Sequence, residues 1–150
     1  MKTIALFRDN FFEKKPVWLP KKLHRVICER SNPRTKSYMT SLLKQHFLHA
    51  EICENLNIKL IANATVVLLY QDAIGLGWSK LEKLCLKHAQ TVMVINGRRR
   101  KFQLTRSTRR KLLLRRFLEI TFLLEMLTAP VLLLAGSIFA LTDKISRKVS

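Results

Sequence analysis

The first third of the chain alternates a short apolar run with polar connections. Residues 3–7 are apolar and precede a turn-prone Asp-Asn pair, which predicts an opening strand. An irregular connection follows, with a short helix expected around 23–29. From about 34 to 55, apolar residues recur every three or four positions after an Asn-Pro pair at 32–33. This stretch therefore predicts a helix that begins at the Asn-Pro pair.

The middle of the chain predicts a βαβ unit. Residues 64–70 form a continuous apolar and β-branched run, as expected of a strand buried on both faces. Ser79 and Glu82 have the spacing of a capping box, and the helix that they would open runs to about residue 88. Residues 91–95 supply the second strand. Such units almost always close with a right-handed crossover and parallel strands.

Few other segments can extend this sheet. The run at 3–7 is one candidate, and residues 58–62 are the other. The fold class that we predict is therefore α/β, with a small parallel sheet that contains the βαβ unit, followed by a basic amphipathic helix and an apolar C-terminal segment.

The C-terminal third changes from basic to apolar. Residues 105–116 predict a basic helix, and residues 117–141 are apolar apart from a few polar positions and the two carboxylates of Glu119 and Glu125. The uncharged part, residues 126–142, holds 17 residues, at the lower end of the about 17 to 25 that cross a bilayer.

Two interpretations of the apolar segment compete. It could be a core helix of a soluble domain, divided by Pro130. However, a helix that is apolar on every side needs partners on every side, and the rest of the chain is too small to surround it. We therefore expect a transmembrane or re-entrant membrane segment at 117–142.

This interpretation divides the chain into four parts. We expect a basic cytoplasmic α/β domain at 1–104, a juxtamembrane helix at 105–116, the membrane segment at 117–142 and a short basic tail at 143–150. Ten cations lie shortly before the segment and three after it, so the positive-inside tendency places the N-terminal domain in the cytoplasm. Three isolated cysteines fit a reducing compartment.

The charge balance limits the classes of partner that the chain is expected to bind. Lys and Arg total 28 against 10 Asp and Glu, a net charge of +18. Such a field attracts nucleic acid, anionic lipid head groups or phosphorylated small molecules. Five cations beside the apolar segment favour an anionic membrane surface. They are Arg109, Arg110, Lys111, Arg115 and Arg116.

The loop after residues 64–70 carries a candidate ligand site. It contains Asp72, Gly75 and Gly77, and it lies between a parallel strand and a helix start, where open α/β sheets bind ligands. Asp72 is the candidate general base or metal-binding carboxylate, and the glycines are candidate ligand-binding residues. The spacing is not G-x-G-x-x-G, so the glycines could instead serve only to turn the chain.

The end of the next strand adds a second group of candidates. Asn96, Arg98, Arg99 and Arg100 follow residues 91–95 and could converge on the same crevice. Arginine offers planar donors that suit a phosphate group. The alternative is that most of these arginines are juxtamembrane charge.

A metal site is a weaker interpretation of the histidines and cysteines. His46, His49 and Cys53 share one predicted helical face, and Cys85 and His88 share another. The same positions fit core packing, which we favour, so we predict no metal site. The cofactor, if any, is not identifiable from the sequence.

Three functions are compatible with these features. The first is a membrane-anchored accessory or binding protein that acts on anionic lipid or phosphorylated ligands. The second is a glycosyl or sugar-phosphate transferase that uses a sugar nucleotide or a lipid-linked phosphate in envelope polysaccharide synthesis. The arrangement resembles that of membrane-associated bacterial transferases of this kind, at the level of architecture only. The third is a nucleic-acid-binding protein, which the charge favours but no recognition motif supports.

Overall fold

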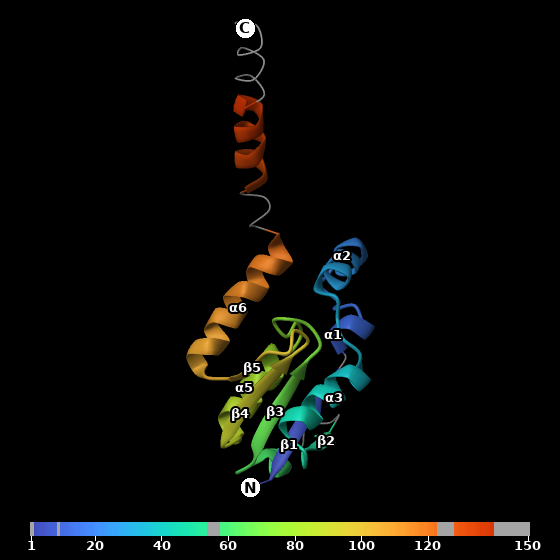
Figure 1. The fold of residues 1–150 in the computed structure, drawn as a ribbon, viewed down its shortest axis with the longest axis vertical. Helices are drawn as coiled ribbons and strands as arrows, with labels where there is room; N and C mark the ends of the chain where they lie inside the picture. The colour runs from blue at the N-terminus through green and yellow to red at the C-terminus, as the bar shows by residue number, and fades with distance from the viewer. Residues whose placement is uncertain (1, 9, 54–57, 123–127, 140–150) are drawn as a thin grey trace, which may run out of the picture. The chain divides into compact units, whose positions relative to one another are not determined.

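The computed structural model of the chain describes residues 2–8, 10–53, 58–122 and 128–139. The chain divides into two compact units, Met1–Arg116 and Phe117–Ser150. The first unit contains a five-stranded sheet with helices on both of its faces (Figure 1). The predicted α/β class is therefore confirmed.

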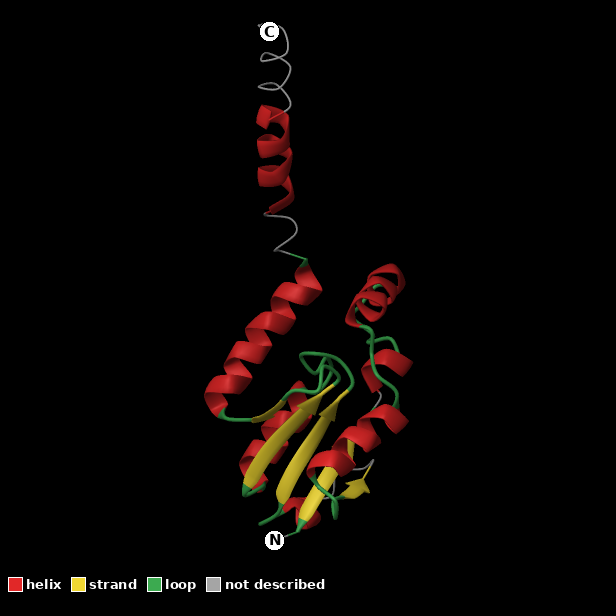
Figure 2. Cartoon of the chain, viewed as in Figure 1, coloured by secondary structure: helices red, strands yellow, loops and turns green. Residues whose placement is uncertain are grey.

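The sheet has the strand order β2-β1-β3-β4-β5. Its strands are β1 (Thr3–Phe7), β2 (Glu51–Cys53), β3 (Thr65–Tyr70), β4 (Thr91–Asn96) and β5 (Lys101–Gln103). The pairs β2–β1, β1–β3 and β3–β4 are parallel, whereas β5 runs antiparallel to β4. The sheet is therefore mixed and larger than the sequence predicts (Figure 2).

Helices lie on both faces of the sheet, α3 (Lys36–His46) on one and α5 (Ser79–His88) on the other. The other labelled helices are α1 (Asn10–Glu13), α2 (Lys21–Ser31), α4 (Ile58–Ile61) and α6 (Arg106–Thr121). On one face, Met39, Leu42 and Leu43 of α3 pack in a cluster with β1, β3 and β4. On the other face, Leu81 and Cys85 of α5 pack in a second cluster. Because both faces are covered, every residue of β3 is buried, as its continuous apolar run predicts.

The helix predicted at 34–55 is wrong in its extent. Asn32 does not open it, because Asn32 ends α2 in the left-handed conformation (φ 44°). The cap of α3 is Thr35, whose hydroxyl accepts a hydrogen bond from the Tyr38 amide at 3.4 Å. The helix ends at His46, and the same apolar spacing continues into the edge strand β2. Residues 54 and 55 lie outside the described part.

The strand candidate at 58–62 is also wrong, because Ile58–Ile61 form the short helix α4. A short apolar run does not by itself separate a strand from a buried helical turn. The strand next to β1 comes instead from residues 51–53, where the sequence predicts the end of a helix.

The second unit contains a helical stretch at 128–139. Its large apolar side chains are exposed, from Ile138 at 61% to Phe139 at 74%. Within the described ranges, no helix is both long enough and apolar enough to cross a membrane. The predicted membrane segment at 117–142 falls partly outside those ranges, and the tail at 143–150 falls wholly outside them.

Candidate functional site

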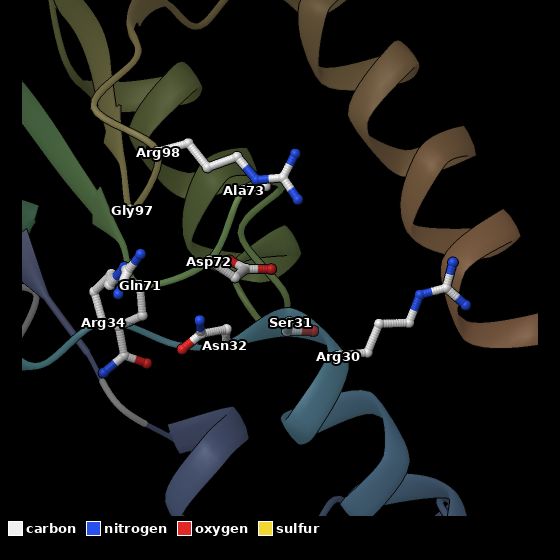
Figure 3. Close-up of a pocket in the computed structure, with 9 residues that line it drawn as sticks. All are labelled: Arg30, Ser31, Asn32, Arg34, Gln71, Asp72, Ala73, Gly97 and Arg98. Atoms are coloured by element: carbon white, nitrogen blue, oxygen red, sulfur yellow. The ribbon is translucent and has the colours of Figure 1, made fainter.

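A cavity of about 210 Å³ lies at the carboxyl ends of β3 and β4. Three segments surround it: the connection between α2 and α3, the loop after β3 and the turn between β4 and β5 (Figure 3). Its lining residues are Arg30, Ser31, Asn32, Arg34, Gln71, Asp72, Ala73, Gly97 and Arg98.

The strand order explains why a cavity forms at this edge. The chain leaves β1 toward β2 on one side, whereas it leaves β3 toward β4 on the other. Such a reversal separates the connections above the carboxyl ends of the strands, and ligands of open α/β folds bind there. The α2–α3 connection, which belongs to the β1–β2 crossover, closes the cavity from the other side.

Backbone contacts hold the three segments together. The Arg34 amide donates to the Gln71 carbonyl at 2.9 Å, and the Gly97 amide donates to the Asp72 carbonyl at 3.1 Å. A Cβ atom at Gly97 would lie 2.2 Å from the Gln71 oxygen, so only glycine permits this close approach. These contacts place Arg34 and Arg98 on the wall of the same cavity.

Asp72 lines the cavity, but both oxygens of its carboxylate accept hydrogen bonds from backbone amides of the loop after β3. One oxygen accepts the amides of Gly75 (2.7 Å) and Leu76 (3.3 Å), and the other accepts Leu76 at 3.2 Å. Burial raises the pKa of Asp72, although the backbone hydrogen bonds oppose that effect. The structure therefore gives Asp72 a role in shaping the β3–α5 loop. Its predicted role as a general base stays a prediction.

The two glycines of that loop pack against aromatic side chains. Gly75 has φ +73°, and a Cβ atom there would lie 2.5 Å from the Tyr70 ring. Gly77 has φ +80°, and its Cβ atom would lie 2.8 Å from Cβ of Phe11. Both conformations favour glycine. Neither residue is among those that line the cavity. The turn of the backbone and the close packing of aromatic side chains explain why both positions are glycine.

Asn96 shapes the turn that carries Arg98. Its Nδ2 donates to the Ala73 carbonyl at 2.9 Å, and its Oδ1 accepts the amides of Arg98 and Arg100 at 3.2 and 2.9 Å. Arg98 lines the cavity, whereas Arg99 is exposed and donates to the Tyr38 hydroxyl at 3.0 Å. Of the three predicted arginines, Arg98 therefore lines the cavity, and Arg99 and Arg100 are not among its lining residues.

The chemistry of the wall favours an anion. Within the part of the chain that the structure describes, the wall carries three arginines, Arg30, Arg34 and Arg98, and one carboxylate, that of Asp72. Comparisons with protein-family models, with curated proteins and with solved structures found no match. The charge and position of the cavity are therefore the basis for assigning a ligand class. Sequence reasoning missed Arg30 and Arg34, because nothing local shows that the α2–α3 connection returns to the edge of the sheet.

A second polar cluster lies in the interior, centred on Glu82. Its side chain is fully buried and accepts hydrogen bonds from the Tyr70 hydroxyl and from both terminal nitrogens of Arg116. The Nε atom of Arg116 donates to the Ile74 carbonyl at 2.9 Å. The predicted capping box is therefore wrong: Trp78 caps α5, and Glu82 pairs with α6 instead.

The basic residues of α6 divide between interior and surface. Arg116 is 5% exposed and belongs to the Glu82 cluster, so its predicted place at a membrane surface is corrected. Arg109 contacts the same cluster, with its Nε 3.6 Å from Glu82 Oε2, and donates to Ser79. The other three predicted surface cations are exposed. They are Arg110, Lys111 and Arg115.

The cysteines and histidines do not form a metal site among the described residues. Cys85 is fully buried, and burial, with a contribution from Glu82, raises the pKa of its thiol to about 12. Cys28 and Cys53 are partly exposed. The helical face predicted for His46, His49 and Cys53 does not exist, because Cys53 lies in β2.

We expect Cys85 to resist thiol reagents in the folded protein. At pH 8 its thiol is protonated and buried, and only the thiolate reacts. Labelling with a chromogenic disulfide should show two fast thiols and one slow thiol, and Cys85→Ala should remove only the slow phase. Three equal rates in the native protein would contradict the burial of Cys85.

Proposed function

We propose that the protein binds a phosphate-bearing ligand in the cavity at the ends of β3 and β4, at the surface of an anionic membrane. The observation that supports this proposal most is that Arg34 and Arg98, which lie far apart in the sequence, line the same cavity, with Arg30 also in its lining. Guanidinium groups match phosphate with paired, charge-assisted hydrogen bonds.

The size of the cavity limits the ligand. Pockets for whole drug-sized molecules or cofactors enclose about 300–1,000 Å³, whereas this cavity encloses about 210 Å³. A phosphate, a pyrophosphate or the phosphate end of a larger molecule fits this space better than an entire sugar nucleotide. A lipid head group or a sugar phosphate would present such an end.

The membrane part of the proposal depends on the C-terminal third. The stretch at 128–139 exposes Val131, Leu132, Leu133, Leu134, Ile138 and Phe139. Consecutive apolar residues face every side of a helix, and lipid covers such a helix more readily than a single protein groove does. The exposed cations of α6 would add attraction to an anionic leaflet, with the first unit on the cytoplasmic side.

A binding role has more support than the transferase alternative. A transferase needs a carboxylate or another basic group that is available to a substrate or a metal ion. Among the described residues, the only carboxylate on the cavity wall is that of Asp72, and both of its oxygens accept backbone amides. The ligand-binding residues are therefore better defined than any catalytic residue.

Arg98→Gln and Arg34→Gln are expected to abolish binding of inorganic pyrophosphate. Pyrophosphate at a hundredfold excess over its dissociation constant should stabilise the wild-type chain by about 2.7 kcal/mol. Each variant should lose most of that stabilisation, because it loses a cation on the cavity wall. Thermal unfolding of the full chain, with and without pyrophosphate, measures the effect.

The matched control is Arg99→Gln, in the same turn. The Arg99 side chain contacts Tyr38 and does not line the cavity, so this variant should respond as the wild type does. Equal loss in all three variants would indicate that only overall charge matters, as for a nucleic-acid binder. No response in the wild type to phosphate, pyrophosphate or uridine diphosphate would reject the proposal.

A further inference from the structure

A turn between α1 and α2 exposes two apolar side chains at its tip. The Leu19 amide donates to the Pro16 carbonyl at 3.0 Å, which closes a β-turn with Val17 and Trp18 at its central positions. Val17 is 98% exposed and Trp18 is 64% exposed, whereas Leu19 is 1% exposed and anchors the turn in the protein. The structure therefore holds Val17 and Trp18 outward.

Four lysines lie close to this tip in the sequence. Lys15 donates to the Leu19 carbonyl at 2.8 Å and to the Pro16 carbonyl at 3.3 Å, so it braces the turn. Lys14, Lys21 and Lys22 flank the turn and are exposed. The nearest carboxylate in the sequence is Glu13, and residues 14–28 contain no acidic residue. The apolar tip is therefore flanked along the chain by positive charge on both sides.

This combination fits an anionic bilayer better than a protein partner. A stable protein interface buries about 800 Å² on each side, far more than two side chains supply. Lysine is depleted in the centres of protein interfaces. Tryptophan, in contrast, is enriched at the membrane–water boundary, where its ring is apolar and its N–H group stays hydrated. Lysines beside it would contact anionic head groups.

We propose that the Val17–Trp18 turn inserts into the head-group region of an anionic membrane. The proposal rests on the membrane-surface role proposed above, and it adds a second attachment point within the first unit. The observations behind it, the exposed Val17 and Trp18, are separate from those on the arginine cavity and on the stretch at 128–139. The turn would hold the folded domain against the lipid surface and make that attachment sensitive to salt.

Tryptophan fluorescence isolates this turn in the full chain. The sequence contains two tryptophans, Trp18 and Trp78, so none lies in the second unit. Trp78 is 3% exposed and packs beside Tyr70 in the core. Vesicles of phosphatidylglycerol and brominated phosphatidylcholine should quench most of the Trp18 emission, because bromine on the acyl chains quenches only an inserted ring. Trp18→Phe should remove the quenchable emission and leave that of Trp78.

Two variants and one control test the proposed chemistry. Lys21→Gln with Lys22→Gln should weaken insertion by about thirtyfold at low ionic strength, from two lysines near an anionic surface. Val17→Asp should also reduce quenching. Leu48→Ser is the control, because Leu48 is 82% exposed but lies in a different turn. This control should leave the quenching unchanged.

The outcomes separate the two proposals. If the chain does not sediment with these vesicles at all, both the membrane-surface role and the insertion of the turn fail. If it sediments but bromine leaves the Trp18 emission intact, only the turn proposal fails. Equal quenching with vesicles of phosphatidylcholine alone would overturn the anionic preference. Quenching that persists in Trp18→Phe would also overturn the proposal, because Trp78 would then be the residue in contact with lipid.

Discussion

Arg116→Met is expected to lower the free energy of unfolding by about 3–5 kcal/mol, the usual cost of removing one partner of a buried ion pair. The substitution puts an apolar side chain of similar length in place of the guanidinium and leaves the Glu82 carboxylate without its main charge partner, with Arg109 at 3.6 Å as the remaining one. The Ile74 carbonyl also loses its donor. Urea denaturation of the full chain, followed by circular dichroism, measures the loss.

The neighbouring residue provides the control. Arg115 is exposed, so Arg115→Met should change stability by no more than about 0.5 kcal/mol. Combining Arg116→Met with Glu82→Gln should recover part of the loss, because the double variant no longer buries a carboxylate that has lost its main charge partner. The Tyr70 hydroxyl would still find an amide oxygen to which it can donate. If Arg116→Met costs no more than Arg115→Met, the buried pair does not stabilise the fold.

Gly75→Ala is expected to cost about 2–4 kcal/mol, from overpacking and from a left-handed backbone. The added Cβ atom would lie 2.5 Å from the Tyr70 ring, which is fully buried and cannot move aside freely. The Tyr70 hydroxyl donates a hydrogen bond to Glu82, so displacement of the ring would disturb the buried cluster as well. The same denaturation experiment measures this cost.

Gly136→Ala is the matched control for Gly75→Ala. No atom lies within 4 Å of a Cβ atom built at Gly136, and this residue lies in the helical stretch at 128–139. Alanine is favoured over glycine in a helix, so this variant should be neutral or slightly stabilising. A Gly75→Ala variant as stable as the wild type would show that the loop has room for a side chain.

The parts of the fold that were predicted correctly are those encoded by contiguous patterns. The run at 64–70, the helix after it and the run at 91–95 became β3, α5 and β4, because a strand covered on both faces leaves a continuous apolar signature. The edge strands β2 and β5 have three residues each and carry no such signature. These two strands form because they pair with β1 and β4, and such pairing cannot be recognised from the local sequence.

Prediction of the candidate site from the sequence was limited in the same way, to residues next to recognisable strands. Asp72 and Arg98 were predicted because the ends of parallel strands are recognisable in a βαβ unit. Arg34 lies far from them in the sequence, and only the backbone contact with Gln71 brings it there. Glu82 was misassigned for a related reason. Its position after Ser79 mimics a capping box, and the partner that explains it lies 34 residues later.

The position of Arg116 at the end of the first unit also bears on where the chain can be shortened. A fragment that stops at residue 110 retains all five strands of the sheet but leaves Glu82 without its main donor. Expression boundaries for the domain should therefore extend beyond Arg116. On the ribosome, the Glu82–Arg116 pair cannot form until this arginine has left the exit tunnel, so the domain completes its interior only after synthesis has passed into the following apolar segment.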